Sequence, residues 1–227
     1  AVLTHVGLAL AKVAQRRTWR MPPWEAVQIA SGFLIPLLLI DHVVTTRVAN
    51  AVAGTRDFYA PVLAYYWPSR AWMQVLLVLV AWTHACIGLH FWLRLDRRYV
   101  RLAPVLLACA VVLPALALAG FMVGGREALA TGGGADAVLR EAGWPLDAEA
   151  QRFRTIANTG LLIFLALVAI VVAWHGWRMW RAQRVKKVAI TYTAGPQVKG
   201  PIGATLLEIS RLRNVPHAPV CGGRARC

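Results

Sequence analysis

Acidic residues are scarce in this chain. Of its 227 residues only 10 are Asp or Glu, and charged residues of all kinds make up 15%. An average soluble domain carries about 25% charged residues, so this composition excludes an ordinary water-soluble globular protein. Hydrophobic residues make up 58% of the chain. The sequence therefore predicts a mainly α-helical, multi-pass membrane protein with a small soluble part.

The chain also lacks an initiating methionine and a recognisable signal peptide, since it opens inside an apolar run and closes on a cysteine. A signal peptide would show a basic start, a short apolar core and a cleavage site of small residues. We therefore expect a fragment that is cut at both ends.

Basic residues outnumber acidic ones, with a formal net charge of +15. Such an excess often indicates nucleic-acid binding, but here the basic residues form clusters at 16–20, 94–101 and 178–187, each beside an apolar stretch. The positive-inside rule explains this placement, so we expect no nucleic-acid partner and a cytoplasmic location for all three clusters. The segments 49–70 and 124–155 then lie on the opposite side of the membrane.

Apolar stretches of membrane-spanning length account for most of the chain. Residues 1–15 are too short to span alone and are predicted to be the second part of a truncated helix. We predict five spans in all, and a missing first helix would make six. The aromatic linker 49–70 is predicted to be a loop on the membrane surface. The complete spans are predicted at 24–48, 71–93, 102–123 and 156–177, within a membrane anchor over residues 1–185.

A histidine lies near the middle of the span 71–93. His84 precedes Arg94 by ten residues, which is about 15 Å along a helix and about half of a ~30 Å hydrocarbon core. Ala81 and Gly88 lie on the same helical face, so small side chains leave room for a flat group beside the imidazole. A polar side chain at this depth indicates a function, and we predict that His84 binds a haem.

His5 is the predicted partner of His84. It precedes Arg16 by eleven residues, so the two imidazoles lie at nearly equal depth, about 15 Å from the cytoplasmic interface. Equal depth on two helices is what bis-histidine ligation of one haem iron requires. The alternative for each histidine is a hydrogen bond across a helix interface.

Two further histidines are candidate cofactor ligands. His42 lies about 27 Å from the cytoplasmic interface, and its partner could come from the missing helix. His90 lies about 9 Å nearer the cytoplasm than His84, where it could ligate a second haem, bond a haem propionate or bond a quinone. We expect one or two haems. His175, at the interface, is predicted to extend its ring toward the head groups, and His217 to be a loop hydrogen-bonding residue.

The character of the chain changes after residue 187. The alternating, β-branched run 188–194 predicts a strand, Gly195 and Pro196 predict a turn, and Thr205 is the predicted N-cap of a short helix. Cys221 and Cys227 follow in the glycine-rich tail CGGRARC. A disulfide is disfavoured on the reducing cytoplasmic side, and this cysteine spacing suits a [2Fe–2S] cluster that needs two further cysteines beyond Cys227. Cys86 and Cys109 are predicted to be small apolar side chains in membrane helices.

Two sets of motifs carry a family resemblance. The run VKGPIGATLLEISRLRNVPHAPVCGGRARC resembles the first half of a β-grasp ferredoxin of the adrenodoxin-like branch. The membrane motifs RRTWRMPPWEAVQ, HVVTTR and THACIGLHFWLR are similar to those of bacterial membrane-bound adenylate/guanylate cyclases. Those proteins have a six-helix haem-b anchor like the dihaem cytochrome b of succinate dehydrogenase and fumarate reductase, then a ferredoxin domain and a cyclase domain.

The resemblance implies a fold and a set of site residues. The anchor histidines match His5, His42, His84 and His90, and the first two cluster ligands match Cys221 and Cys227. Residues 186–227 would be the N-terminal half of an α+β ferredoxin domain on the cytoplasmic side. The cyclase domain, through which the protein would form a homodimer, is absent, so no catalytic residue is expected in this chain.

Three functions compete at this point. The first is a redox-sensing module in which a quinol or another membrane donor reduces the haem and a downstream cyclase responds. The second is the cytochrome b subunit of a quinone-linked oxidoreductase. The third is a transporter or a structural anchor, but this function does not explain why histidines lie at membrane depth.

Overall fold

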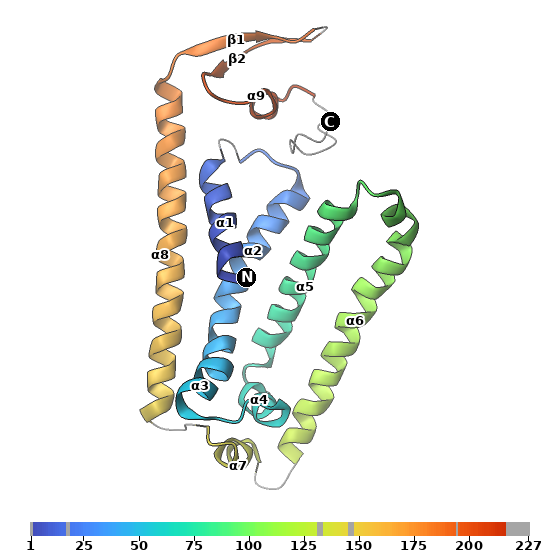
Figure 1. The fold of residues 1–227 in the computed structure, drawn as a ribbon, viewed down its shortest axis with the longest axis vertical. Helices are drawn as coiled ribbons and strands as arrows, with labels where there is room; N and C mark the ends of the chain where they lie inside the picture. Colours follow the sequence, from blue (N-terminus) through green and yellow to red (C-terminus); the bar gives the residue numbers. More distant parts are fainter. Residues whose placement is uncertain (1, 17–18, 131–133, 145–147, 194, 217–227) are drawn as a thin grey trace. The chain divides into compact units, whose positions relative to one another are not determined.

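The computed structural model describes residues 2–16, 19–130, 134–144, 148–193 and 195–216, and these residues are mostly helical (Figure 1). The chain divides into two compact units, one of residues 1–23 with 164–227 and the other of residues 24–163. We call the second the central unit. The helices are α1 (Val2–Gln15), α2 (Pro23–Val43), a π-helical segment (Val44–Val48), α3 (Ala49–Ala53), α4 (Tyr59–Tyr66), α5 (Ala71–Leu93), α6 (Arg97–Ala130), α7 (Gly134–Glu141), α8 (Ala148–Arg184) and α9 (Leu206–Arg213), and the strands are β1 (Lys187–Thr191) and β2 (Gln197–Pro201).

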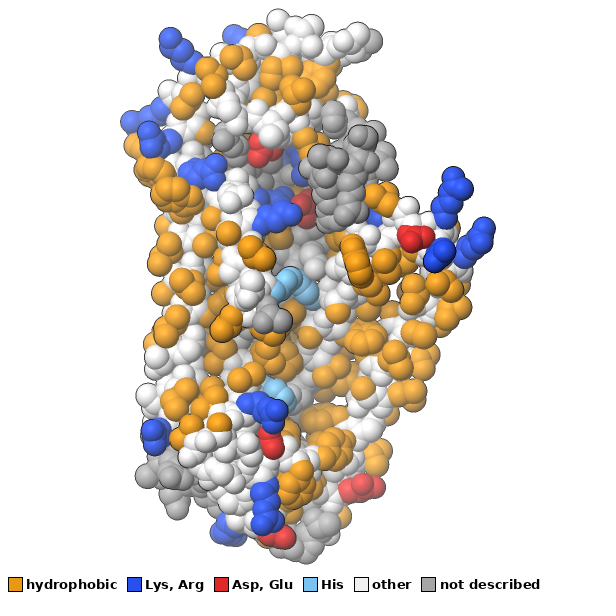
Figure 2. Space-filling model, in the orientation of Figure 1, with side chains coloured by type: hydrophobic (Ala, Val, Ile, Leu, Met, Phe, Trp, Pro, Cys, Tyr) orange, Lys and Arg blue, Asp and Glu red, His pale blue; other side chains and the backbone are white. Residues whose placement is uncertain are grey.

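Four helical segments are long and apolar enough to cross a membrane. They are Pro23–Ala53, Ala71–Leu93, Arg97–Ala130 and Ala150–Ala182, and at most 11% of the most apolar window of each is buried. Figure 2 shows the apolar side chains spread over the helix surfaces. Surfaces of this kind suit lipid rather than water, so the structure supports a membrane protein with four complete spans. Helix α1 has 14 residues and is too short to be a fifth.

Helices α5 and α6 run antiparallel through the central unit and are joined by a short turn (Figure 1). The indole Nε1 of Trp82 donates a hydrogen bond of 2.8 Å to the carbonyl oxygen of Ala110, which ties the two helices together. In lipid this bond has no water to compete with it. Trp82 therefore takes part in a helix–helix contact in the structure.

The segments 49–70 and 124–155 lie at one end of the central unit, as the predicted alternation of spans requires. Helix α4 packs against α6 and α7 there. The segment 49–70 was predicted to be a loop, and the structure differs, because it contains the short helices α3 and α4. Some of its aromatic residues pack together, whereas Phe58 and Tyr59 are exposed. Tyr66 is 1% exposed, and the Tyr65 ring lies 5.0 Å from that of Tyr66 and 4.9 Å from that of Trp144. Removing these large rings from water stabilises this end of the unit.

After α8 the chain forms a small two-stranded unit with a helix. Strands β1 and β2 pair antiparallel, with Val188 opposite Gly200. Helix α9 packs on β2 so closely that a Cβ on Gly200 would lie 2.5 Å from the Cδ1 atom of Ile209. Thr205 caps α9 in a capping box with Glu208, as its position before the apolar residues predicted.

The predicted strand, turn and helix are therefore confirmed, with the first strand ending at Thr191 rather than at residue 194. The ferredoxin fold and the division at residue 185 stay predictions. Cys221, Cys227 and His217 lie outside the residues that the structure describes.

Candidate functional site

His84 contacts helix α2 in the middle of the central unit. Its Nδ1 lies 3.1 Å from the Ser31 Oγ, and its Nε2 lies 3.3 Å from the Gln28 amide nitrogen. The Ser31 hydroxyl donates to the carbonyl oxygen of Val27 at 2.7 Å, so it accepts from His84. The network thus assigns the ring proton to Nδ1 and leaves the Nε2 lone pair facing the Gln28 amide. We call His84, Gln28, Ser31 and Gly32 the central layer.

A glycine lets the two helices approach at this layer. A Cβ on Gly32 would lie 3.0 Å from the Cε1 atom of His84, tighter than nearly all real contacts. The sequence expected open space beside Gly88 for a flat group. The structure differs, because a Cβ on Gly88 would lie 3.4 Å from the Gln28 amide nitrogen, so that amide occupies the space. A group bound at His84 Nε2 therefore has to displace the Gln28 side chain, which is long and rotatable.

His42 has a different environment, at the end of α2. Its ring is stacked on that of Tyr66, with centroids 5.9 Å apart and 24° between the planes. The Gln74 side chain lies near the imidazole, while Nδ1 is buried and has no hydrogen-bond partner among the described residues. We call His42, Tyr66, Gln74 and Thr45 the tyrosine layer. A buried ring nitrogen without a partner is costly, so this atom fits a ligand that the chain itself does not supply.

The π-helical segment begins two residues after His42. The Thr46 hydroxyl donates to the carbonyl oxygen of His42 at 2.6 Å, and the Thr45 hydroxyl donates to that of Asp41 at 2.7 Å. These bonds satisfy the carbonyl groups that a π-helical turn displaces from the regular ladder. Short π-helical segments often accompany functional sites, and this one continues without a break into α3.

The two layers lie at different levels of the same helix pair. Ser31 meets His84 and Gln74 meets His42, so α2 and α5 run antiparallel with a fixed register. Eleven residues of α2 separate Ser31 from His42, which is about 16 Å along the axis. Two imidazoles on one metal ion lie only about 4 Å apart, at about 2 Å per bond. His42 and His84 therefore cannot be the two axial ligands of one iron.

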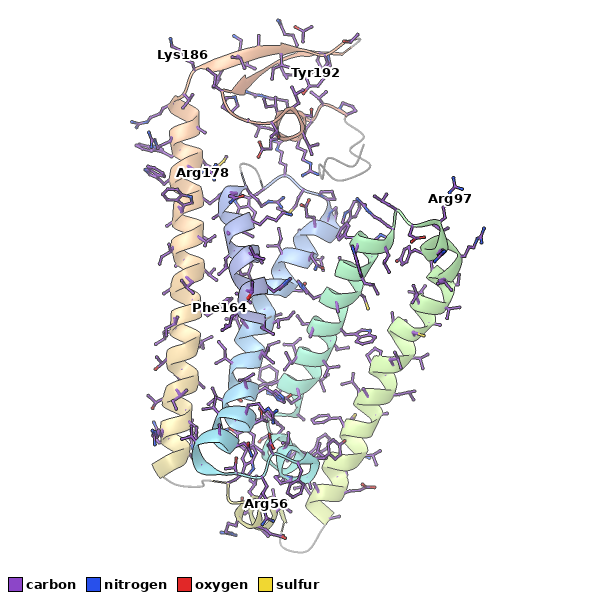
Figure 3. All side chains as sticks on the ribbon, viewed as in Figure 1. Arg56, Arg97, Phe164, Arg178, Lys186 and Tyr192 are labelled. Atoms are coloured by element: carbon purple, nitrogen blue, oxygen red, sulfur yellow. The ribbon has the colours of Figure 1, made fainter. Side chains whose placement is uncertain are left out.

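The other two predicted ligands lie apart from these layers. His90 is exposed near the end of α5, where Arg97 marks the start of α6 in Figure 3, and its Nδ1 lies 2.8 Å from the Tyr99 hydroxyl. His5 is exposed on α1, in the other unit. The predicted pairing of His5 with His84 joins the two units and stays a prediction.

His175 departs from its expected role. The sequence predicted a ring extended toward the head groups, but the side chain is only 4% exposed. Its ring lies edge-on to Trp19 with centroids 4.8 Å apart, and both ring nitrogens are buried without a partner in the described part of the chain. Sequence reasoning missed this burial because Trp19 is far away along the chain. It also missed Gln28, Ser31 and Gln74, because only the register of the two helices brings them close to the histidines.

Among the described residues, no group of three or more His, Cys, Asp or Glu side chains could hold a metal ion. No protein-family model, no curated protein and no solved structure matches this chain.

Proposed function

We propose that this chain is the membrane-embedded redox-sensing part of a longer protein, which holds b-type haem within its helices and a [2Fe–2S] cluster in its cytoplasmic tail. In this proposal the two carriers regulate a C-terminal adenylate or guanylate cyclase. A bound haem supplies reversible one-electron transfer at membrane depth. The protein would lie in a bacterial inner membrane and dimerise through the cyclase domain.

The central layer is the observation that carries the proposal. The Ser31 hydroxyl orients His84 and holds its proton on Nδ1, so the lone pair of Nε2 faces the Gln28 amide. Ligating imidazoles usually have their second nitrogen fixed in this way by a neighbouring group. A ligand that displaced the Gln28 amide would find a histidine already in the correct tautomer and orientation.

The tyrosine layer supports a second centre. The buried Nδ1 atom of His42 needs a partner, and the level of His42 on α2 excludes that it shares an iron with His84. Two haems are therefore the version of the proposal that uses both histidines. His5 is proposed as the second ligand at the level of His84, because its distance from Arg16 in the sequence predicts the same depth in the membrane. His90 is proposed as a group near the cytoplasmic surface.

The unit after α8 supports the cluster. A hairpin followed by a capped helix is how a β-grasp domain of the ferredoxin type begins, and in the sequence the cysteine motif starts eight residues after the end of α9. The proposal places the cluster on Cys221 and Cys227 together with two further thiolates. The reducing cytoplasm and the glycines at 222 and 223 suit thiolate ligation rather than a disulfide.

The test of the haem proposal is a reduced-minus-oxidised spectrum of membranes that contain the protein. The unaltered chain should show b-type bands, and His84→Ala should lose those of one centre while the protein is still inserted. Arg152→Gln, an exposed change on α8 away from both layers, is the matched control. An unchanged spectrum in His84→Ala overturns the proposal. If His5→Ala affects a different centre from His84→Ala, the pairing is wrong.

A further inference from the structure

A pocket of about 150 Å³ lies in the central unit beside the tyrosine layer, and neither haem nor cluster accounts for it. A water molecule needs about 10–15 Å³ of such space, so the pocket has room for a small organic molecule. We call it the tyrosine pocket. Its walls come from α2, the π-helical segment, α3, α7, α8 and the residues around α4, and the lining residues are Asp41, Thr45, Ala49, Tyr65, Arg70, Leu139, Trp144, Ala150, Phe153 and Arg154.

Opposite charges face this pocket without pairing. Asp41 supplies a carboxylate, while Arg70 and Arg154 supply guanidinium groups. In the described part of the chain, neither arginine forms an ion pair with Asp41, and the Asp41 carboxylate makes no hydrogen bond. Asp41 is half-buried, and a carboxylate that is partly removed from water without a partner costs free energy, which a cationic group on a ligand would recover. Arg154 is exposed, and its guanidinium group is open to an anionic group on the same ligand.

Tyr65 lines the same pocket, and the charges of both signs act on its pKa. Burial raises the pKa of its phenol, the negative charge of Asp41 raises it further, and the positive charges of Arg70 and Arg154 lower it. The Arg70 guanidinium donates a hydrogen bond to the Tyr65 hydroxyl and stacks over its ring at 4.5 Å from the centroid. Arg70 is thus used to hold Tyr65, which leaves Arg154 as the cation available to a ligand.

The apolar wall of the pocket is rigid. The Trp144 indole donates to the carbonyl oxygen of Arg56 at 3.2 Å and packs in a buried cluster with Leu139. Phe153 is 6% exposed and packs in a second buried cluster with Val44. A pocket with an acid at one point, a base at another and fixed aromatic walls suits a compact molecule that carries an ammonium group, a carboxylate and an apolar side chain.

We propose that the tyrosine pocket binds an α-amino acid, with Asp41 receiving its ammonium group and Arg154 its carboxylate. The side chain of the ligand lies against Trp144 and Phe153. By the positive-inside rule this end of the unit faces away from the cytoplasm, so the ligand comes from outside the cell. The inference does not depend on haem, and it gives the chain a chemical input besides a redox one.

The experiment uses the whole protein in phospholipid nanodiscs. Each of the twenty standard L-amino acids is added singly at millimolar concentration, and the midpoint of thermal unfolding is measured. At least one is expected to raise the midpoint, since a ligand that binds only the folded state stabilises it. If none of the twenty does so, the proposal is wrong.

Two analogues of the tightest amino acid then test the charge assignment by isothermal titration calorimetry. One is the amine that lacks the carboxylate, and the other is the acid that lacks the ammonium group. Each is expected to bind about ten- to hundredfold more weakly, as the loss of a hydrogen-bonded charge predicts. An acid that binds as tightly as the amino acid would mark a plain anion site and would overturn the proposal.

Two variants of the pocket should each lose the preference for one charged group of the ligand. Asp41→Asn is expected to bind the amino acid and its acid analogue equally, and Arg154→Gln to bind the amino acid and its amine analogue equally. Arg152→Gln, on the same helix but outside the pocket, should keep the full preference. Unchanged preferences in both pocket variants would show that binding occurs elsewhere and would overturn the proposal.

Discussion

His84 and His42 are the same residue type in the same helix pair, yet their surroundings differ in kind. The ring of His84 faces polar side chains at both nitrogens and a glycine at its edge. The ring of His42 is stacked on a buried tyrosine and keeps one buried nitrogen without a partner among the described residues. The comparison teaches that the central layer is a satisfied network which a ligand has to open, whereas the tyrosine layer is an unsatisfied one which a ligand would complete.

The largest expected effect concerns haem content. His84→Ala and His42→Ala should each remove one of two spectral components, and the double variant should show no b-type absorbance. The reason is that about 16 Å along α2 separates the two levels, so they cannot serve one iron. Redox titration of the difference spectrum measures this. A single variant that loses all absorbance would show that the layers form one site and would break the comparison.

The next effect concerns the close contact at the central layer. Gly32→Ala should destabilise the protein by about 1–3 kcal/mol, because the added methyl group meets the His84 ring in a packed interface. Gly120→Ala is the matched control, since a Cβ there has nothing within 4 Å, and it should be neutral or slightly stabilising. Chemical denaturation in detergent micelles gives both values. Equal effects would mean that His84 does not pack against α2.

A smaller effect is expected at the tyrosine layer. The Tyr66 hydroxyl lies 2.8 Å from the Thr45 Oγ, and Tyr66→Phe should cost about 1 kcal/mol through the loss of this buried hydrogen bond. Tyr59→Phe alters a side chain that is 64% exposed and should change stability by less than about 0.5 kcal/mol. The same denaturation measurement applies. If Tyr66→Phe matched Tyr59→Phe, the hydroxyl bond would not help to fix the layer.

The smallest effect is a pH dependence. Burial raises the pKa values of Tyr65 and Tyr66 above the ordinary 10.0 of a tyrosine. The folded chain therefore holds these protons above pH 10.0, where the unfolded chain begins to lose them, so the stabilisation is complete below pH 10.0 and decreases as the pH rises. Unfolding midpoints measured on both sides of pH 10.0 should fall less steeply in Tyr66→Phe. Parallel curves would show that the Tyr66 phenol ionises as in water.

Much of the fold follows from the sequence because bilayer thickness imposes a length on apolar helices. The span 71–93 is confirmed to the residue, and the end of α9 that Thr205 caps is where its side chain predicts it. The two short helices of the segment 49–70 were not predicted, because its aromatic residues suit a surface loop and a packed cluster equally well. Only contacts with the distant Trp144 decide between the two.

The candidate site was predictable only in part. The spacing of His84 from Arg94 gave its depth, but no local pattern identifies Gln28 or Ser31 as its neighbours, since these depend on the antiparallel register of two helices. The tyrosine pocket had no signal at all in the sequence. Its charged residues are separated along the chain and lie together only because the ends of three spans and two short helices meet.

Helix α8 ends at Arg184 and strand β1 begins at Lys187. Only two residues connect them, and each spans at most about 3.6 Å. A helix of 37 residues is also about 55 Å long, so it exceeds a ~30 Å hydrocarbon core by several turns. The hairpin is therefore tethered to a stiff rod, and any rotation or piston movement of that rod within the bilayer has to carry the first strand with it.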